Sequence, residues 1–286
     1  PTAYRSHTIG QVVNDGGEMV GTQVTLAGYA ESVRGRGGVC FVMLRDGTGR
    51  IQAFLKRDAM DELVFESIQS SSRESTISVT GVVAQKRPPK TPEGVPAPPP
   101  EYEVSVSSAE ILALAEAPLP VGVVDDVNVG LDVRLDNRHL DVRRAHVNAM
   151  FQLRSKVLQY GREHLIEEGF SEMNSPKIIA SASEGGTNLF PMMYFDTPAY
   201  LSQSPQLYKQ LAVLGGLERV FEIGPAFRAE KHDTYRHLNE FVSFDIEAAW
   251  CDDEDVMGVL ERMIHSIWSR ISACLLYTSP SPRDDG

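Results

Sequence analysis

Hydrophobic and polar residues alternate over much of the stretch from Val24 to Leu114, and this period of two is typical of β-strands. Three short runs of this kind read VTLAGYAES, VCFVMLRDG and RIQAFLK, and the turn-forming residues Asp46-Gly47-Thr48-Gly49 join the last two. A helical stretch at 58–68 precedes two further strands, around residues 76–85 and 102–114. Five short strands with a helix before the fourth predict a barrel of the oligonucleotide-binding (OB) type, with an SH3-like barrel as the alternative.

The second half of the chain has the longer period of amphipathic helices. One helix is predicted from Ala145 to Glu168, with Gly169 where a stop is expected, and another begins at about Asp252. Between them lie strand-like pieces, a short helix opened by Ser204-Pro205, and two strands, RVFEIGPAFRAE and EFVSFDIEAAW. The core side of the first helix is predicted to carry Val147, Met150, Phe151, Val157, Leu158 and Leu165. These elements together predict an α+β protein.

Prolines and glycines mark the connections between these elements. Residues 86–101 hold seven of the 17 prolines and predict an extended loop that protrudes from the barrel. Residues 117–143 lose any hydrophobic period, so we expect a barrel domain at 1–116, a linker at 117–143 and a second domain at 144–271. Residues 272–286 break the pattern of the last helix and resemble read-through of a sequencing adapter, so we expect a non-native tail there.

Composition narrows the class of protein. Hydrophobic residues make up 42% of the 286 and charged residues 23%, as in ordinary globular proteins. The chain has no apolar run of the ~18–20 residues that cross a bilayer and no signal-peptide pattern, so we expect a cytoplasmic protein without a membrane partner. The three cysteines, Cys40, Cys251 and Cys274, are far apart and indicate neither a disulfide nor a zinc site, so we expect Cys40 and Cys251 to be free thiols. The net charge is −12, but residues 1–60 carry +2, which fits either a nucleic-acid surface or ordinary mixed charge.

The strand EFVSFDIEAAW indicates a site. Its alternation sends Phe241, Ser243, Asp245 and Glu247 to one face and apolar side chains to the other. If the preceding strand runs to residue 230, Arg228 and Glu230 share a face, and a hairpin can bring an arginine, an aromatic ring and carboxylates together. Such a set suits a nucleotide, with arginine for a phosphate, the ring for a base and carboxylates for an amine or magnesium. A solvated outer face is the alternative.

Three other segments carry candidate residues. The loop between the two strands holds Lys231, His232, Arg236 and His237, which fit either a polyphosphate or a charged surface turn. In SQSPQLYKQ we expect Ser204 to cap a helix whose Gln206 and Lys209 share a face. In the first turn Lys209 gains nothing from the helix dipole and favours an anionic partner. A substrate carboxylate is one candidate, and Glu218, Glu222 or solvation by water are the alternatives. Glu184 precedes two glycines that suit a mobile lid or a plain turn.

Taken together, FRAEKHDTYRHLNEF, SEGGTNLF, SQSPQLYKQ, LDNRHLDVRR and the SPK after the long helix resemble the aspartyl branch of the class II aminoacyl-tRNA synthetases, of archaeal or eukaryotic type. This resemblance covers about nine-tenths of the chain. It implies a five-stranded OB-fold anticodon-binding barrel, followed by a catalytic domain on an antiparallel sheet with flanking helices. It also implies that aspartate and ATP, with Mg²⁺, give aspartyl-adenylate, and that the product is transferred to tRNA(Asp), with tRNA(Asn) left open. A cytoplasmic homodimer is implied as well.

The resemblance assigns roles residue by residue. The implied ATP-binding residues are Arg228 on the α-phosphate, Arg236 and His237 on the outer phosphates, Glu230 on the adenine amino group or acceptor end, and Phe241 stacked on adenine, with Arg228 and His237 as the catalytic pair. The implied aspartate-binding residues are Ser183, Glu184, Ser204, Gln206, Asp245 and, on the β-carboxylate, Lys209. Glu247 would hold magnesium, Pro176 would lie at a dimer interface, and Phe41 and Gln52 would contact anticodon bases.

The sequence also departs from the family pattern. The third class II motif and the arginine that would join Lys209 are missing, so we expect a truncated chain that forms no adenylate by itself. Aspartate-dependent pyrophosphate exchange by this chain would contradict that expectation. The alternatives are an asparaginyl-tRNA synthetase, which Lys209 disfavours because a carboxamide gives a buried ammonium no partner, and a tRNA-binding module without catalysis. An amidating relative is a further alternative, but the predicted barrel argues against it.

Overall fold

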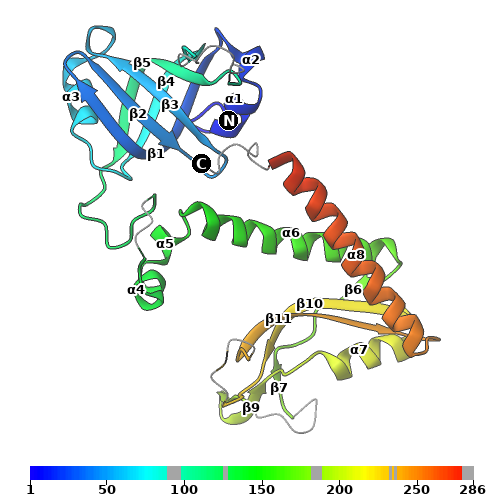
Figure 1. The fold of residues 1–286 in the computed structure, drawn as a ribbon. Helices are drawn as coiled ribbons and strands as arrows, with labels where there is room; N and C mark the ends of the chain where they lie inside the picture. The colour runs from blue at the N-terminus through cyan, green and yellow to red at the C-terminus, as the bar shows by residue number, and fades with distance from the viewer. Residues whose placement is uncertain (89–97, 125–127, 182–188, 232–233, 235–236, 279–286) are drawn as a thin grey trace. The chain divides into compact units, whose positions relative to one another are not determined.

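The computed structural model describes residues 1–88, 98–124, 128–181, 189–231, 234 and 237–278, with the backbone alone for 274–278. The chain divides into two compact units, residues 1–147 and 148–286 (Figure 1). Each unit has its own hydrophobic core, and each is described by itself. The predicted proline-rich loop and the predicted lid lie largely outside the described residues, as does most of the loop after residue 231.

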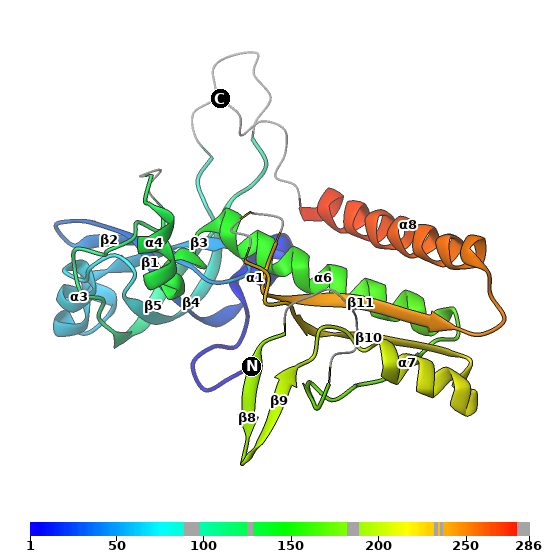
Figure 2. The same cartoon turned by 90° about the horizontal axis from the view of Figure 1, so that it is seen from below.

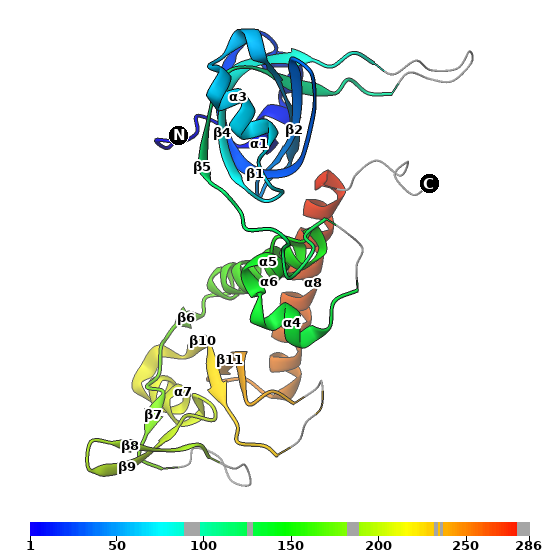
Figure 3. The ribbon, with the colours of Figure 1, turned by 90° about the vertical axis from the view of Figure 1, so that its left-hand side faces the viewer.

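The first unit is a closed five-stranded barrel with the strand order β1-β2-β3-β5-β4. The strands are β1 (Gln23–Arg36), β2 (Val39–Arg45), β3 (Arg50–Lys56), β4 (Thr76–Gln85) and β5 (Tyr102–Ala113). Figure 3 looks along the barrel and shows these strands as a ring. The pairing of β3 with β5 is parallel, and the other neighbours are antiparallel. The predicted OB-type barrel is therefore confirmed.

Local sequence explains how the barrel forms. Alternate residues of β2 and β3 are buried, because each strand packs one face against the core. In the turn between these strands, Asp46 Oδ1 accepts hydrogen bonds from the backbone N–H groups of Thr48 and Gly49, at 2.7 and 3.1 Å. Helix α3 (Glu62–Gln69) is capped by Asp61 and buries Phe65 and Ile68 in the barrel core. Three shorter elements complete this part: α1 (Ile9–Asn14), α2 (Gly16–Met19) and the 3₁₀ turn η1 (Arg57–Ala59).

The predicted linker contains two short helices that the hydrophobic pattern did not indicate, α4 (Leu131–Asp136) and α5 (Arg138–Asp141). The carboxylate of Asp141 is fully buried and accepts hydrogen bonds from Arg134 and Arg138, at 2.8 and 2.5 Å. The hydrogen bond from Arg134 is the main reason why the pKa of Asp141 is lowered, and burial opposes it. Leu140 of α5 packs in a small apolar cluster with Val121 and Val123, and the charge pairs of Asp141 complete the segment. One buried leucine makes no periodic stripe, which is why periodicity missed these helices.

The second unit surrounds a small sheet with helices. It comprises α6 (Ala145–Glu167), β6 (Ser171–Glu172), β7 (Ile178–Ile179), β8 (Pro191–Tyr194), β9 (Thr197–Leu201), α7 (Gln206–Ala212), the π-helical turn η2 (Val213–Leu217), β10 (Arg219–Phe227), β11 (Glu240–Ala248) and α8 (Asp253–Thr278). One sheet has the order β11-β10-β6 and another β7-β9-β8. Helices α6 and α8 cover one face of the β10–β11 pair and α7 lies against the other (Figures 1 and 2). The predicted α+β class is confirmed.

Several detailed predictions can be compared with these helices. Gly169 follows α6 with a φ of +84°, as the predicted helix stop requires. The prediction that Met150 and Phe151 face the core was wrong, because their exposed fractions are 55% and 41%. Helix α8 continues to Thr278, and a helical backbone does not distinguish a native from a non-native sequence, so the tail stays a prediction. Among the described helices, none combines the length and apolar composition that a bilayer crossing requires.

Two cysteines are described and both are free thiols, as predicted. Cys40 is fully buried in the barrel core, and this burial raises the pKa of its thiol. A buried thiol with a raised pKa is a poor nucleophile, so Cys40 has the properties of a packing residue.

Candidate active site

The β10–β11 hairpin separates an apolar face from a polar one. Strand register places Phe221 opposite Ile246, and both pack in the core under α6 and α8. The next pair, Glu222 and Asp245, is directly opposed across the two strands, so both carboxylates leave the other face. Ser243 donates a hydrogen bond to Asp245 on this face. The predicted two-faced character of β11 is confirmed.

Helix α7 brings an amide and an ammonium to the polar face. Lys209 is only 3% exposed, and its Nζ lies 3.4 Å from Asp245 Oδ1 and 3.6 Å from Glu247 Oε2. Gln206 Nε2 donates to Glu247 Oε2 at 3.1 Å. The Lys209 ammonium also donates a hydrogen bond to the backbone carbonyl of Ile246, at 3.1 Å, so its anionic neighbours are Asp245 and Glu247 and its closest acceptor is a main-chain oxygen. Glu222, one of the carboxylates considered for this role, has other partners.

The start of α7 differs by one residue from the prediction. Pro205 occupies the cap position and the helix begins at Gln206, so Ser204 precedes the cap. Ser204 is buried, and its Oγ accepts a hydrogen bond from the Gln206 backbone N–H at 3.4 Å. The serine therefore stays at the helix start and close to Gln206, although it is not the formal cap.

An arginine and an aromatic ring meet further along the hairpin. The guanidinium of Arg228 lies over the Phe241 ring, 5.4 Å from its centroid. Strand β10 ends at Phe227, so the prediction that the strand continues to residue 230 was wrong. Hydrogen bonds hold the hairpin closed beyond that point, because Arg228 N–H donates to Asn239 O at 2.9 Å. With its amide oriented to satisfy both atoms, the Asn239 nitrogen donates to the carbonyls of Arg228 and Glu230, at 3.1 and 3.0 Å.

The other predicted site residues fall into two groups. His237 is exposed, and its Nδ1 lies 2.7 Å from Thr234 Oγ1. Ser183, Glu184 and Arg236 lie outside the described residues. Within the described part of the chain, the structure thus gathers Arg228 and Phe241 at one end of the polar face. It gathers Gln206, Lys209, Asp245 and Glu247 at the other.

Sequence reasoning missed a buried ion pair on the same face. Glu222 is 2% exposed, accepts the Ser175 N–H at 2.7 Å and forms an ion pair with Lys177. These two partners flank Pro176, which is itself exposed. The alternation of RVFEIGPAF indicated that Glu222 would face away from Phe221, but nothing local in Ser-Pro-Lys indicated its partners.

Glu247 was also predicted as a magnesium ligand. Its carboxylate contacts the Gln206 amide and the Lys209 ammonium, both of which are hydrogen-bond donors that occupy the sites a cation would use. The described residues include no group of three His, Cys, Asp or Glu side chains arranged to hold a metal ion. These side chains do not fit a protein-built magnesium site, so we derive no step through the ion.

The barrel presents a second candidate surface. Phe41 is 38% exposed and stacks on Phe54, with ring centroids 5.1 Å apart. Gln52 Nε2 donates to Glu103 Oε2 at 2.7 Å. The prediction named Phe41 and Gln52 but missed Phe54 and Glu103. Glu103 reaches Gln52 only through the parallel pairing of β3 with β5, which a hairpin pattern does not reveal.

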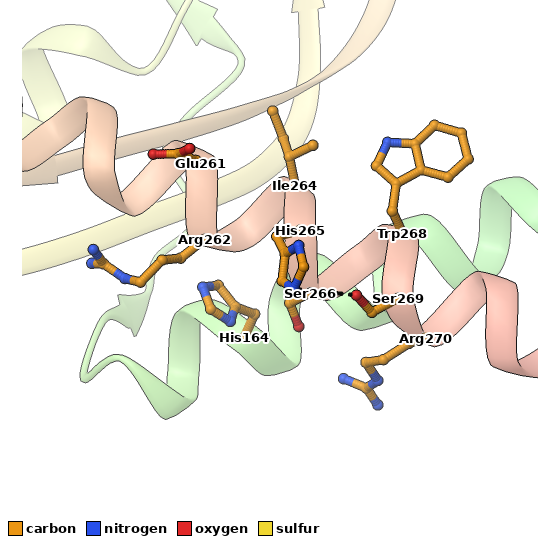
Figure 4. Close-up of a pocket in the computed structure, with 9 residues that line it drawn as sticks. All are labelled: His164, Glu261, Arg262, Ile264, His265, Ser266, Trp268, Ser269 and Arg270. Atoms are coloured by element: carbon orange, nitrogen blue, oxygen red, sulfur yellow. Dashed lines mark hydrogen bonds between the residues drawn. The ribbon is translucent and has the colours of Figure 1, made fainter.

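A surface hollow of the second unit lies elsewhere. It is lined by His164 of α6 and by α8 residues between Glu261 and Arg270 (Figure 4). Ser269 Oγ lies 3.5 Å from His265 Nε2 beside it, and Trp268 is 63% exposed. The lining includes no residue of β10, β11 or α7, so this hollow is separate from the candidate active site.

Comparisons with known proteins identify the family of each part of the chain. The model of the family described as tRNA synthetases class II (D, K and N) matches residues 130–282. A model described as an OB-fold nucleic acid binding domain matches residues 24–112.

Individual relatives are close. An aspartate–tRNA(Asp/Asn) ligase of Archaeoglobus fulgidus is 48% identical over 255 residues, which cover 89% of this chain and 57% of the relative. One from Methanosarcina barkeri is 45% identical over 251 residues, covering 88% of this chain and 54% of the relative. The chain therefore spans little more than half the length of these relatives.

Solved structures show the same likeness. The asparaginyl-tRNA synthetase of Pyrococcus horikoshii complexed with asparaginyl-adenylate has a TM-score of 0.77 and 35% identity, covering 88% of this chain and 56% of that one. The aspartyl-tRNA synthetase of Entamoeba histolytica has a TM-score of 0.74 and 31% identity, and the match covers 94% of this chain and 56% of that one. With a family match over more than half its residues and relatives above 40% identity, the chain belongs to the class II tRNA synthetases of the D, K and N group.

Proposed function

We propose that the protein is an aspartate–tRNA ligase, which activates aspartate with ATP and transfers the aspartyl group to the 3′ end of tRNA(Asp). The observation that carries the proposal is the buried ammonium of Lys209 on the polar face of β11. Its two carboxylate neighbours, Asp245 and Glu247, lie 3.4 and 3.6 Å away, so a ligand with a carboxylate side chain can offer this ammonium a closer anionic partner. The names of the relatives support the same amino acid and extend the proposal to tRNA(Asn).

The geometry supports a division of the amino-acid pocket. Lys209 lies 3.4 Å and 3.6 Å from two carboxylates, which is longer than a tight charge-assisted hydrogen bond. The β-carboxylate of aspartate would take Lys209 as its partner. Asp245, with Ser204 and Gln206 close by, would then accept the α-ammonium. This exchange keeps every buried charge paired.

ATP would bind at the other end of the polar face. Phe241 would stack on the adenine, and the guanidinium of Arg228 would contact the α-phosphate, with His237 and Arg236 toward the outer phosphates. The aspartate α-carboxylate oxygen then forms a bond to the α-phosphorus. The bond from that phosphorus to its bridging oxygen breaks, and pyrophosphate leaves. Arg228 offsets the repulsion between the two reacting anions.

The barrel would read the anticodon. An exposed ring such as that of Phe41 provides a stacking surface for an unpaired base, and Gln52 provides hydrogen bonds. We also propose a cytoplasmic homodimer in which the exposed Pro176 lies at the interface. Each of these assignments follows the family resemblance.

Two alternatives make different demands. An asparaginyl-tRNA synthetase is favoured by the 35% identity to the Pyrococcus horikoshii structure, but its substrate carries a neutral carboxamide that gives Lys209 no counter-charge. A tRNA-binding module without catalysis would bind tRNA through the barrel and would bind neither ATP nor aspartate. Affinities for aspartate, asparagine, ATP and tRNA separate these alternatives.

Isothermal titration of the chain with aspartate and with asparagine tests the proposal. Aspartate should bind more tightly, and Lys209→Leu should weaken it by about 100-fold, because a buried charge loses its partner. Lys156→Leu, which removes an exposed lysine of α6, is the matched control and should leave the Kd unchanged. An unchanged aspartate Kd in Lys209→Leu would remove Lys209 from the pocket, and tighter binding of asparagine would favour the asparaginyl alternative.

A further inference from the structure

Two carboxylates of the candidate site face each other across the β10–β11 pair. Glu222 and Asp245 are directly opposed in the strand register, and Glu222 is only 2% exposed. Directly opposed side chains in an antiparallel pair have Cβ atoms about 5 Å apart, and like charges at that separation repel. The polar face therefore requires a cation close to each carboxylate.

Two lysines from different segments meet this need. Lys209 of α7 lies beside Asp245 and Glu247. Lys177, which follows Pro176 in the connection between β6 and β7, forms an ion pair with Glu222 and donates to Ser175 Oγ at 3.1 Å. Around the opposed pair, the described residues thus contribute the carboxylates of Glu222, Asp245 and Glu247 and the ammonium groups of Lys177 and Lys209, and Lys177 pairs with the one carboxylate that Lys209 does not contact.

The main chain of Lys177 is also attached to the site. Ser202 N–H donates to Lys177 O at 2.9 Å, and Phe227 N–H donates to Ser202 O at 2.9 Å. Ser202 lies two residues before Ser204, and Phe227 directly precedes Arg228. The Ser175–Lys177 segment is consequently bonded to Glu222 through its side chains and backbone, and to the segment that leads into α7.

We infer that Lys177 and Glu222 form a positioning pair for the amino-acid pocket, in which Lys177 compensates Glu222 so that Lys209 remains available to Asp245 and to the carboxylate of the ligand. The inference rests on the proposed binding of aspartate. Neither residue contacts the ligand in this account. Lys177 acts through Glu222, and Glu222 acts through its position opposite Asp245.

The pair has an asymmetric consequence when it is broken. Without Lys177, the buried Glu222 keeps the Ser175 N–H as its hydrogen-bond donor among the described residues, and the next ammonium on this face is Lys209. Lys209 would then be the ammonium nearest to all three carboxylates, so it would be less available to a ligand carboxylate. Replacing Glu222 by glutamine removes the excess negative charge and leaves Lys177, whose side chain is 25% exposed, to be solvated. Loss of both charges should therefore weaken aspartate binding less than loss of Lys177 alone.

The test compares Lys177→Met, Glu222→Gln and the double variant in the same chain. Titration with aspartate gives the Kd, and thermal unfolding gives the stability of each variant. We expect Lys177→Met to weaken aspartate binding about tenfold, since one charge-assisted contact is of this size, and the double variant to recover to within about threefold of the parent. Lys177→Gln, a smaller change, covers the case in which Lys177→Met does not fold, and it should weaken binding in the same direction.

The outcomes separate the two proposals. Equal aspartate affinity in the parent, Lys177→Met and Lys177→Gln would overturn the positioning role, even if the variants unfold at lower temperature. Failure of the double variant to recover affinity would overturn it as well. A parent chain that binds no aspartate would overturn the proposed function and, with it, the inference.

Discussion

At the scale of single residues, the exposed ring of Phe41 offers a direct test of the barrel surface. Phe41→Ala removes one ring of the Phe41–Phe54 stack without entering the core, so the barrel should stay folded. Stacking on an unpaired base contributes about 1–3 kcal/mol, and tRNA binding should weaken by the corresponding factor. Filter binding at fixed salt measures this loss. Val82→Ala, on an exposed part of β4, is the control, and an equal loss in both variants would argue against a specific stacking site.

Individual side chains also show how far sequence reasoning reaches. Alternation along β11 predicted the shared face of Asp245 and Glu247 because strand period depends only on neighbouring residues. The same logic predicted Lys209 and Gln206 on one side of α7. The pair of Lys177 and Glu222 was not predictable in this way, since 45 residues separate them and Ser-Pro-Lys has no local pattern of its own. The partner of a buried charge is set by tertiary packing.

At the scale of elements, α6 packs closely against the sheet through a glycine. A Cβ at Gly161 would lie 2.5 Å from Cε1 of the Phe244 ring, which is part of the core. Gly161→Ala should therefore destabilise the second unit, although alanine favours helices by about 1 kcal/mol. Gly258→Ala in α8 is the matched control, because its Cβ would meet only Nη1 of Arg262, at 3.2 Å, and this nitrogen is not one of the two that donate to Glu168. Urea unfolding should show opposite signs for the two variants, and equal stabilisation would contradict the close packing.

An ion pair between helices predicts how acid affects the same unit. Arg262 of α8 donates two hydrogen bonds to Glu168, which follows α6, and hydrogen bonding by Arg262 is the main cause of the lowered pKa of Glu168. Because the folded state holds this proton less tightly than the unfolded chain, the contribution is complete above the ordinary pKa near 4.5 and is lost as pH falls through the folded pKa.

Arg262→Gln should consequently destabilise the second unit at pH 7 and have a smaller effect at pH 3. Urea unfolding at the two pH values measures the difference. The exposed Arg154 of α6 provides the control, since Arg154→Gln should show little dependence on pH between these values. An Arg262→Gln effect that grows on acidification would contradict the assigned direction of the Glu168 shift.

The elements that the hydrophobic pattern predicted best are those with one buried face. The strands of the barrel and the helices α6 and α8 have clear periods, and their existence and type were predicted from residues 24–85 and 145–271. Helices α4 and α5 were missed because they are held by the charge pairs of Asp141 and by a single buried leucine, Leu140, and neither produces a hydrophobic period. The end of β10 was placed too late because Arg228 and Glu230 continue the alternation of the strand while their backbone leaves the ladder.

At the scale of the whole molecule, each of the two hydrophobic cores is expected to stabilise its own unit. Leu26 lies in the barrel core and Leu165 in the core of the second unit, and both are fully buried. Each core is assembled from residues of one unit, so the loss of packing in one should not be felt directly in the other. Leu26→Ala and Leu165→Ala form a matched pair, because each deletes the same side chain from a site without solvent.

Each substitution should cost about 2–5 kcal/mol, the range for a leucine removed from a packed interior. Differential scanning calorimetry of the chain should then resolve two transitions, with Leu26→Ala lowering one midpoint and Leu165→Ala the other. Far-ultraviolet circular dichroism, followed over the same temperatures, assigns each transition to a unit, since the barrel is rich in strands and the second unit holds the two long helices α6 and α8. A single transition that moves by the same amount in both variants would mean that the units unfold together, and that the separate cores do not make separate folding units.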